Sequence, residues 1–304
     1  MLLRVNIFNT SSNLPLLAAL ANGYFEKRGL SIEVQNTPNS DAQRAGLADG
    51  RFEIAHAAVD NAVAMVESAG QDVVIVCGGD AGMNDFMVRA EINTMADLRG
   101  KLLAVDAPNT SYALAAKKIL KLHGLLENRD YAVRLAGGTG QRAAAMVADL
   151  QLAAAMINPP FSFTVRENGL KSLGSQFDLL GPYQATGAFV MRAWAVAHAD
   201  ALQRYLAGYI DGQRHVMSAA NRASMIRLLV GSFSLPAAAA EGTYEALVKP
   251  GSGLAPDAAF HSRGFETVLA IRAEMEGMWG GTPPAAGKYL DLSHYSRAIA
   301  MASE

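Results

Sequence analysis

Five polar clusters of this 304-residue chain carry hydroxyl, amide and guanidinium groups that could bind a small polar solute. Each cluster follows a short apolar run and leads into a stretch with helical spacing. The clusters are residues 9–13, 58–61, 106–112, 138–142 and 158–161. A loop that leads into a helix exposes free N–H groups and the positive end of the helix dipole, which favour anionic or strongly polar ligand groups. Together the clusters predict a binding site for such a ligand.

Single residues of these clusters also have a structural interpretation. Asn13, Asp60 and Thr110 are of the types that cap helix N-termini, and for each one alone capping is favoured over ligand contact. Arg44 and Arg142 could clamp an anion or could be solvated helix residues, and the sequence favours neither. A ligand site is therefore indicated by the clusters as a group.

Catalytic and metal-binding patterns are missing from the sequence. The six histidines show no metal-binding spacing, no Gly-x-Ser-x-Gly elbow is present, and Gly137 to Gly140 lack the Gly-Lys-Ser/Thr of a phosphate-binding loop. His56 ends a predicted strand, where a hydrogen-bonded structural histidine is favoured over a catalytic one. Cys77 follows an apolar run and is interpreted as a small core residue. We therefore expect no catalytic residue, no metal site and no cofactor.

The elements that would position the clusters alternate between strands and helices in the first half of the chain. Apolar runs predict strands at residues 5–8, 31–35, 52–57, 73–76, 86–89, 102–105, 132–135 and 152–157. Helical spacing predicts helices at about 15–22, 41–48, 60–69, 111–123 and 141–149, and a mainly helical chain from Trp194 onward. This alternation is typical of an α/β fold with mostly parallel sheets, in which ligands bind at the carboxyl ends of strands.

A weak internal repeat indicates two similar lobes. Gln43-Arg44-Ala45 recurs as Gln141-Arg142-Ala143, and Ala48-Asp49 recurs as Ala148-Asp149. Each copy lies on a predicted helix between a polar loop and an apolar strand. The length of the chain also fits two domains of about 150 residues each.

Composition excludes several classes of protein. The chain is 51% hydrophobic and 18% charged, which excludes disorder. A formal net charge of −2, without any block dense in Lys and Arg, argues against nucleic-acid binding through phosphates. A single cysteine excludes an intramolecular disulfide framework and a cysteine-based zinc cluster. No run of roughly 18 apolar residues predicts a membrane span, and residues 1–8 lack the features of a signal peptide.

Five short motifs follow one another along residues 5–275. They are Gly23 to Leu30, Asp49 to Ala55, Asp97 to Lys101, Gly138 to Arg142 and Ile157 to Phe161. Their order and spacing resemble the type 2 periplasmic binding protein fold. More narrowly, they resemble the ABC-transporter substrate-binding group for sulfonates, nitrate and thiamine pyrimidine precursors.

This resemblance implies two lobes of mixed sheets flanked by helices, joined by two crossover strands and closing on a small ligand like a hinge. The crossovers would be Phe86 to Arg89 and Ala188 to Arg192, so that lobe one comprises residues 1–90 and 188–304 and lobe two comprises residues 91–187. The matching loops imply ligand-binding residues in the cleft between the lobes. They are Asn9, Thr10, Ser11, Asp60 and Asn61 from lobe one, and Asn109, Thr110, Ser111, Thr139, Gln141, Arg142 and Asn158 from lobe two.

The sequence departs from the group's pattern in three respects. Leu150 to Ala154 replace a segment that often reads Gly-x-x-Asp-Ala in the group. An exported receptor would need a leader, and residues 1–8 lack the features of one. Enzymes also occur on this scaffold. One cysteine cannot supply the cysteine cluster of the pyrimidine-precursor synthases, and Asn9 and Thr10 stand where desulfinases have a nucleophilic cysteine. These residues do not exclude a decarboxylase on this scaffold.

We therefore expect a monomeric solute-binding protein that captures a sulfonate, an aromatic carboxylate or a pyrimidine and presents it to an ABC-transporter permease. Tyr112, Phe161 and Tyr183 would suit stacking on a planar ring. The location would be periplasmic if a leader has been removed and otherwise cytoplasmic. The alternative is a cytoplasmic enzyme on the same scaffold, such as an aromatic-acid decarboxylase that depends on His56.

Overall fold

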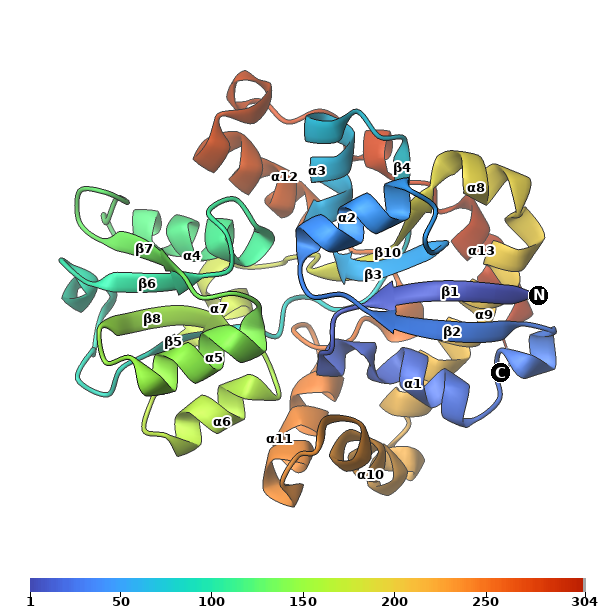
Figure 1. Cartoon of the computed structure of the whole chain (residues 1–304), viewed down its shortest axis with the longest axis horizontal. Coiled ribbons are helices and arrows are strands. Elements are labelled where there is room, and N and C mark those ends of the chain that lie inside the picture. Colours follow the sequence, from blue (N-terminus) through green and yellow to red (C-terminus); the bar gives the residue numbers. More distant parts are fainter. Residues whose placement is uncertain (303–304) are drawn as a thin grey trace. The chain divides into compact units, whose positions relative to one another are not determined.

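Figure 1 shows the computed structural model of the chain, which describes residues 1–302. The chain folds into two compact units. Unit 1 comprises Met1–Ala81, Gln184–Ser262 and the stretch from Ala285 onward, and unit 2 comprises Gly82–Tyr183 and Arg263–Pro284. The backbone therefore passes from one unit to the other four times.

The unit 1 sheet has the strand order β2-β1-β3-β10-β4. Its strands are β1 (Leu2–Ile7), β2 (Ser31–Asn36), β3 (Ile54–Ala58), β4 (Val73–Gly78) and β10 (Thr186–Met191). β1 pairs in parallel with β2 and β3, and β10 runs antiparallel to both β3 and β4. Because β1 and β3 are parallel neighbours, the loops that follow them leave the same end of the sheet, the end at which these strands finish.

Unit 1 contains eight helices within the described residues. They are α1 (Leu14–Ala21), α2 (Ser40–Ala48), α3 (Asp60–Ala69), α8 (Arg192–Ala197), α9 (Ala199–Met217), α10 (Arg222–Phe233), α11 (Ala237–Val248) and α13 (Ser293–Met301), with short 3₁₀ turns η1 (Ser11–Asn13), η2 (Glu26–Arg28), η4 (Ala219–Asn221), η5 (Pro256–Ala258) and η7 (Ala286–Tyr289). α1 and α9 pack so closely that a Cβ on Gly212 of α9 would lie 2.2 Å from the carbonyl oxygen of Pro15, on α1. Leu16, Tyr205 and Ala298 place α1, α9 and α13 in one core with the sheet.

The unit 2 sheet repeats this architecture with the strand order β7-β6-β8-β5-β9. Its strands are β5 (Asp85–Val88), β6 (Leu102–Val105), β7 (Ala132–Leu135), β8 (Leu152–Ile157) and β9 (Lys171–Ser175). β6 pairs in parallel with β7 and β8, and β5 runs antiparallel to β8 and β9. In both sheets the reversed strand is therefore the fourth, which confirms the two similar halves that the sequence repeat predicts.

Helices of unit 2 lie on both faces of its sheet (Figure 1). They are α4 (Ser111–Leu122), α5 (Thr139–Ala148), α6 (Phe161–Glu167), α7 (Gln176–Leu180) and α12 (Ser262–Glu276), with 3₁₀ turns η3 (Met95–Leu98) and η6 (Met278–Gly281). Ile119 of α4 packs on one face, in a core that contains Phe86 and Met156. α5 and α6 pack on the other face, around Ile157.

Residues 263–284 pack in unit 2, whereas the sequence analysis assigns them to lobe one. Ion pairs join α12 to α4 in this position: Glu274 of α12 lies 2.6 Å from Nζ of Lys118 and 3.0 Å from Nζ of Lys121, both on α4. The sequence signal for such a pairing is weak, since the partners are more than 150 positions apart.

Within residues 1–302, no single helix is long and apolar enough to cross a membrane. The stretches 219–233 and 237–248 satisfy that test only as a pair, which is bent by 117°.

Candidate functional site

The candidate residues of unit 1 follow the carboxyl ends of β1 and β3, and we call them the unit 1 edge: Asn9, Thr10, Ser11, Asp60 and Asn61. Asn9 is exposed and Thr10 is half-buried, with its hydroxyl 2.8 Å from that of Ser12. Ser11, Asp60 and Asn61 are buried at 0, 4 and 6% exposure. The structure thus brings these residues to one end of the unit 1 sheet.

Asn13 and Thr110 are the N-cap residues of α1 and α4, but neither side chain makes a capping bond to its helix. The amide of Asn13 instead donates to the carbonyl oxygen of Phe8 at 2.7 Å, which folds the loop after β1 back on itself. Asp60 is the first residue of α3 rather than the residue before it. The hydroxyl of Thr110 donates to the carboxylate of Asp106. The predicted N-cap position is therefore confirmed for Asn13 and Thr110, without a side-chain bond to the helix, and is one residue off for Asp60.

A buried amide network beneath the unit 1 edge was not predicted. Nε2 of Gln43, on α2, donates to Oδ1 of Asn6 at 3.0 Å and lies 3.4 Å from the carbonyl oxygen of His56. Gln43 is fully buried and Asn6 is 5% exposed. Gln43 ties the carboxyl ends of β1 and β3 together and so supports the two loops that follow. The repeat of Gln43 at Gln141 is the only sequence signal for it.

His56 and Cys77 lie in the unit 1 core. Nε2 of His56 is 2.7 Å from the Tyr205 hydroxyl, and its ring centroid is 4.7 Å from that of Tyr209. Burial lowers the pKa of His56 to about 3 and raises the pKa of Cys77 to about 12. At neutral pH the imidazole is therefore uncharged but a weak base, and the thiol is protonated rather than the reactive thiolate. This core position disfavours the enzyme alternative that depends on His56.

The candidate residues of unit 2 follow β6, β7 and β8, and we call them the unit 2 edge: Asn109, Thr110, Ser111, Thr139, Gln141, Arg142 and Asn158. Because β7, β6 and β8 are parallel neighbours, these loops also leave one end of their sheet. Asn109 and Gln141 are exposed, Thr110 and Thr139 are half-buried, and Ser111, Arg142 and Asn158 are buried.

The side chain of Arg142 is buried and hydrogen-bonded, so it is not a solvated helix residue. It is 2% exposed, and its guanidinium donates to the carbonyl oxygens of Met156 and Gly137 at 3.1 and 2.8 Å and to Oγ1 of Thr139 at 3.2 Å. Burial lowers the pKa of Arg142, while the Asp106 carboxylate, 3.9 Å away, raises it. Arg142 therefore fixes the loop after β7 to β8 and places a buried positive charge beneath the unit 2 edge.

The structurally equivalent positions of the two units differ by one residue from the positions that match in the sequence repeat. Gln43 and Arg142 are each the fourth residue of their helix, α2 and α5, and each side chain reaches carbonyl oxygens of the third strand of its own sheet. Gln141, the residue that matches Gln43 by letter, is exposed and accepts a bond from the amide of Gly138. The same structural position thus carries an amide in unit 1 and a guanidinium in unit 2.

The loop between β6 and α4 is fastened from three sides. Lys117 donates to the carbonyl oxygen of Pro108 at 2.8 Å, and Arg272 of α12 donates to that of Asn109 at 3.2 Å. The Ser111 hydroxyl lies 2.8 Å from that of Tyr183. These contacts give the exposed Asn109 a fixed backbone.

The three aromatic residues predicted to stack on a ring differ in exposure. Tyr183 is 1% exposed. Phe161 is half-buried and packs over Gly140, where a Cβ would lie 3.1 Å from the ring. Tyr112 is half-buried. Tyr112 and Phe161 thus keep part of their rings open, while Tyr183 is committed to the interior.

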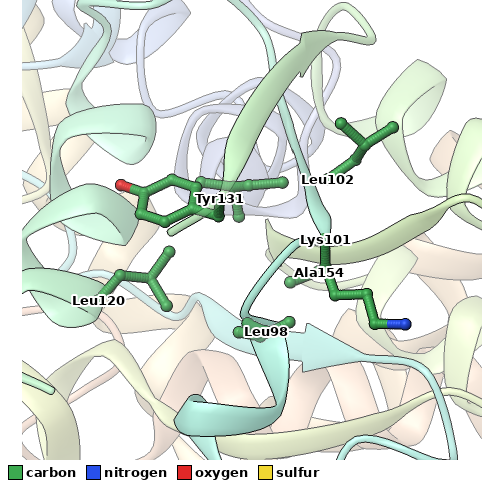
Figure 2. A pocket seen from close by; sticks show the side chains of 7 residues that line it. Leu98, Lys101, Leu102, Leu120, Tyr131 and Ala154 are labelled. Atoms are coloured by element: carbon green, nitrogen blue, oxygen red, sulfur yellow. The ribbon is translucent and has the colours of Figure 1, made fainter. Parts of the chain in front are cut away.

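Other features of the described chain add no second site. Residues 1–302 contain no group of three or more His, Cys, Asp or Glu side chains that could hold a metal ion. Figure 2 shows a small pocket of unit 2 whose lining is mostly apolar: Leu98, Lys101, Leu102, Leu103, Leu120, Tyr131 and Ala154. The Lys101 ammonium and the Tyr131 hydroxyl point to opposite sides of it. It is a gap in the core between α4 and the sheet, with few groups to bind a polar solute.

Two sheets of the same order, each with polar loops at the ends of its parallel strands, define the class of two-unit α/β binding folds. The family model described as NMT1/THI5 like matches residues 10–169, more than half of the chain. The chain therefore belongs to the NMT1/THI5-like family. No curated protein matches the sequence.

Solved structures share this fold over nearly the whole chain. The alkanesulfonate-binding protein SsuA from Xanthomonas axonopodis pv. citri, bound to MOPS, is 20% identical, with a TM-score of 0.74 over 95% of this chain and 96% of its own. The periplasmic nitrate-binding protein NrtA from Synechocystis PCC 6803 is 13% identical, with a TM-score of 0.80 over 99% of this chain and 88% of its own.

A third similar structure is the ligand-binding component of an ABC-type import system from Staphylococcus aureus, with zinc bound. It is 14% identical, with a TM-score of 0.78 over 98% of this chain and 99% of its own. At these identities the likeness shows the fold alone, which is the periplasmic binding protein fold. The predicted fold class and family group are confirmed.

Proposed function

We propose that this protein is the solute-binding component of an ABC-type uptake system and captures a small polar or anionic organic solute. The binding groups come from the unit 1 edge and the unit 2 edge. The candidate solutes are sulfonates, aromatic carboxylates and pyrimidines. Its partner is a transporter permease, and its location is periplasmic.

One observation carries this proposal: each unit presents hydroxyls and amides at the carboxyl ends of its parallel strands, directly before helices. Asp60 and Asn61 begin α3, Ser111 begins α4 and Thr139 begins α5. Helix N-termini bind anionic and strongly polar groups through free N–H groups and the helix dipole. Membership in the family and the fold of transport proteins that bind alkanesulfonate and nitrate support the same function.

A thermal-shift screen against sulfonates, nitrate, aromatic acids and pyrimidines tests the proposal. A solute at 100 times its Kd stabilises the folded protein by about 2.7 kcal/mol, which raises the melting temperature by several degrees. We expect one chemical class to raise it and to be recovered unchanged after overnight incubation with the protein. A flat screen, or a solute that is chemically converted, would overturn the proposal.

A further inference from the structure

Three buried carboxamides lie side by side at one end of the unit 2 sheet. β5 is the antiparallel neighbour of both β8 and β9, and Asp85 lies opposite Ile157 on one side and Ser175 on the other. The next position therefore sets Asn84 between Asn158 and Gln176. Their exposures are 1, 6 and 0%. We call these three residues the amide triad.

The amide triad belongs to the face of the sheet that α4 covers. Phe86 and Val88 on β5, and Met156 on β8, pack in the core beneath α4. Since side chains of a strand alternate between faces, Asn84 and Asn158 continue this row beyond the apolar core. The row ends where β8 ends, so the amide triad lies at the unit 2 edge.

Hydrogen bonds within the amide triad leave three polar atoms unpaired. Nδ2 of Asn84 donates to Oε1 of Gln176 at 3.1 Å. Among residues 1–302, no group pairs with Oδ1 of Asn84, Oδ1 of Asn158 or Nε2 of Gln176, although all three atoms are buried. A buried polar atom without a partner destabilises the fold, and native proteins pair most of them.

The free atoms of Asn84 and Gln176 are one hydrogen-bond donor and one acceptor, whichever way the two amides are oriented. Exchanging N and O in both Asn84 and Gln176 keeps the bond between them and again leaves one donor and one acceptor free. The complement of such a pair is a neutral group with an N–H beside a C=O. A sulfonate, carboxylate or nitrate offers acceptors only, so it would set oxygen against oxygen at one of the two atoms.

We propose that the amide triad binds a carboxamide or ureido group of the solute, whatever other groups the solute carries. This inference rests on the proposed function and names the ligand chemistry at the unit 2 edge. The ligand's N–H donates to an amide oxygen of the amide triad, and its C=O accepts from an amide nitrogen. The pairing removes the cost of the orphaned atoms only when solute is bound.

The double variant Asn84→Leu/Gln176→Met tests whether these residues bind solute or support the fold. It replaces both partners by apolar side chains of similar size, a change that leaves no buried polar atom unpaired at these two positions. We expect the free double variant to melt at or above the wild-type temperature. A lower melting temperature would show a structural role and overturn the inference. Asn168→Leu/Gln151→Met, at two exposed amides of unit 2, is the matched control.

Binding is measured with a panel in which each ring or alkyl scaffold occurs as the carboxamide, the urea, the carboxylate and the sulfonate. We expect carboxamides or ureas to raise the wild-type and control melting temperatures, and the double variant to lose about tenfold or more in affinity for them. Binding of carboxylates or sulfonates alone, or carboxamide binding that the double variant retains, would overturn the inference while the proposed function stands. If no compound binds, the proposed function fails and the inference fails with it.

Discussion

At the scale of single residues, buried polar side chains hold the two edges in place. Gln43 in unit 1 and Arg142 in unit 2 occupy equivalent helix positions and bond to strand carbonyl oxygens beneath the candidate loops. Neither side chain points into solvent. Their role is to fix the loops whose exposed residues, such as Asn9 and Asn109, can meet a solute.

Arg142→Met should lower the free energy of unfolding by about 2–4 kcal/mol, because the carbonyl oxygens of Met156 and Gly137 lose their donors inside the protein. Urea unfolding followed by circular dichroism measures this. The control is Arg134→Met, whose guanidinium is part-exposed beside Asp149 and should contribute about 0–1 kcal/mol. Equal losses in the two variants would contradict the assigned role of Arg142.

His56 should make the protein less stable in mild acid. Burial holds its pKa at about 3, below the roughly 6.5 of an unfolded histidine. Between these values the unfolded chain binds one more proton at this residue, so the free energy of unfolding falls as the pH falls, by about 1.4 kcal/mol per pH unit once well below 6.5.

Urea unfolding at pH 7 and pH 5 measures this effect in the wild type and in His56→Gln. We expect the variant to lose less stability between the two pH values than the wild type does. His123→Gln, at an exposed histidine, should keep the wild-type dependence on pH. A His56→Gln variant with the same dependence as the wild type would show that His56 is not buried in its neutral form.

At the scale of elements, α12 is a distant part of the chain that fastens the loop between β6 and α4. Its Arg272 donates to the carbonyl oxygen of Asn109, and its Glu274 pairs with Lys118 of α4. The unit 2 edge is therefore completed by residues that follow all of its strands in sequence.

Arg272→Met should loosen this loop. We expect faster hydrogen exchange at the amides of residues 109–112, measured by mass spectrometry, and weaker binding of any solute found in the screen. Arg263→Met, at an exposed position of the same stretch, is the control and should leave both unchanged. Unchanged exchange in Arg272→Met would mean that the loop keeps its conformation without α12.

Sequence patterns predict the regular elements well and the buried polar contacts poorly. The strands β6, β7 and β8 and the helix α3 have the predicted bounds, because apolar runs or helical spacing mark them. β9 was not predicted. It is the outermost strand of its sheet, and Lys171 to Ser175 are half-buried and contain only one leucine, so no apolar run marks them. Asn84 and Gln176 carry no local signal, because only the pairing of three strands brings them together.

At the scale of the whole molecule, the chain repeats one architecture in two units. Both sheets place their reversed strand fourth, and both present polar loops after parallel strands. The repeat was predicted from a few matching letters in Gln43 to Ala45 and Gln141 to Ala143, and the strand orders confirm it. The packing of residues 263–284 in unit 2 had no such pattern, because it brings together segments that are far apart in the sequence.

The proposed function requires residues of both edges to bind the same solute and to leave it unchanged. Calorimetric titration of the first solute from the screen tests this most directly, with Asn9→Ala for unit 1, Asn109→Ala for unit 2 and the exposed Asn168→Ala as control. We predict one site in the wild type and the control, affinity about fivefold to tenfold weaker in each edge variant, and full recovery of the solute. Wild-type affinity in both edge variants, or conversion of the solute during the titration, would contradict the claim.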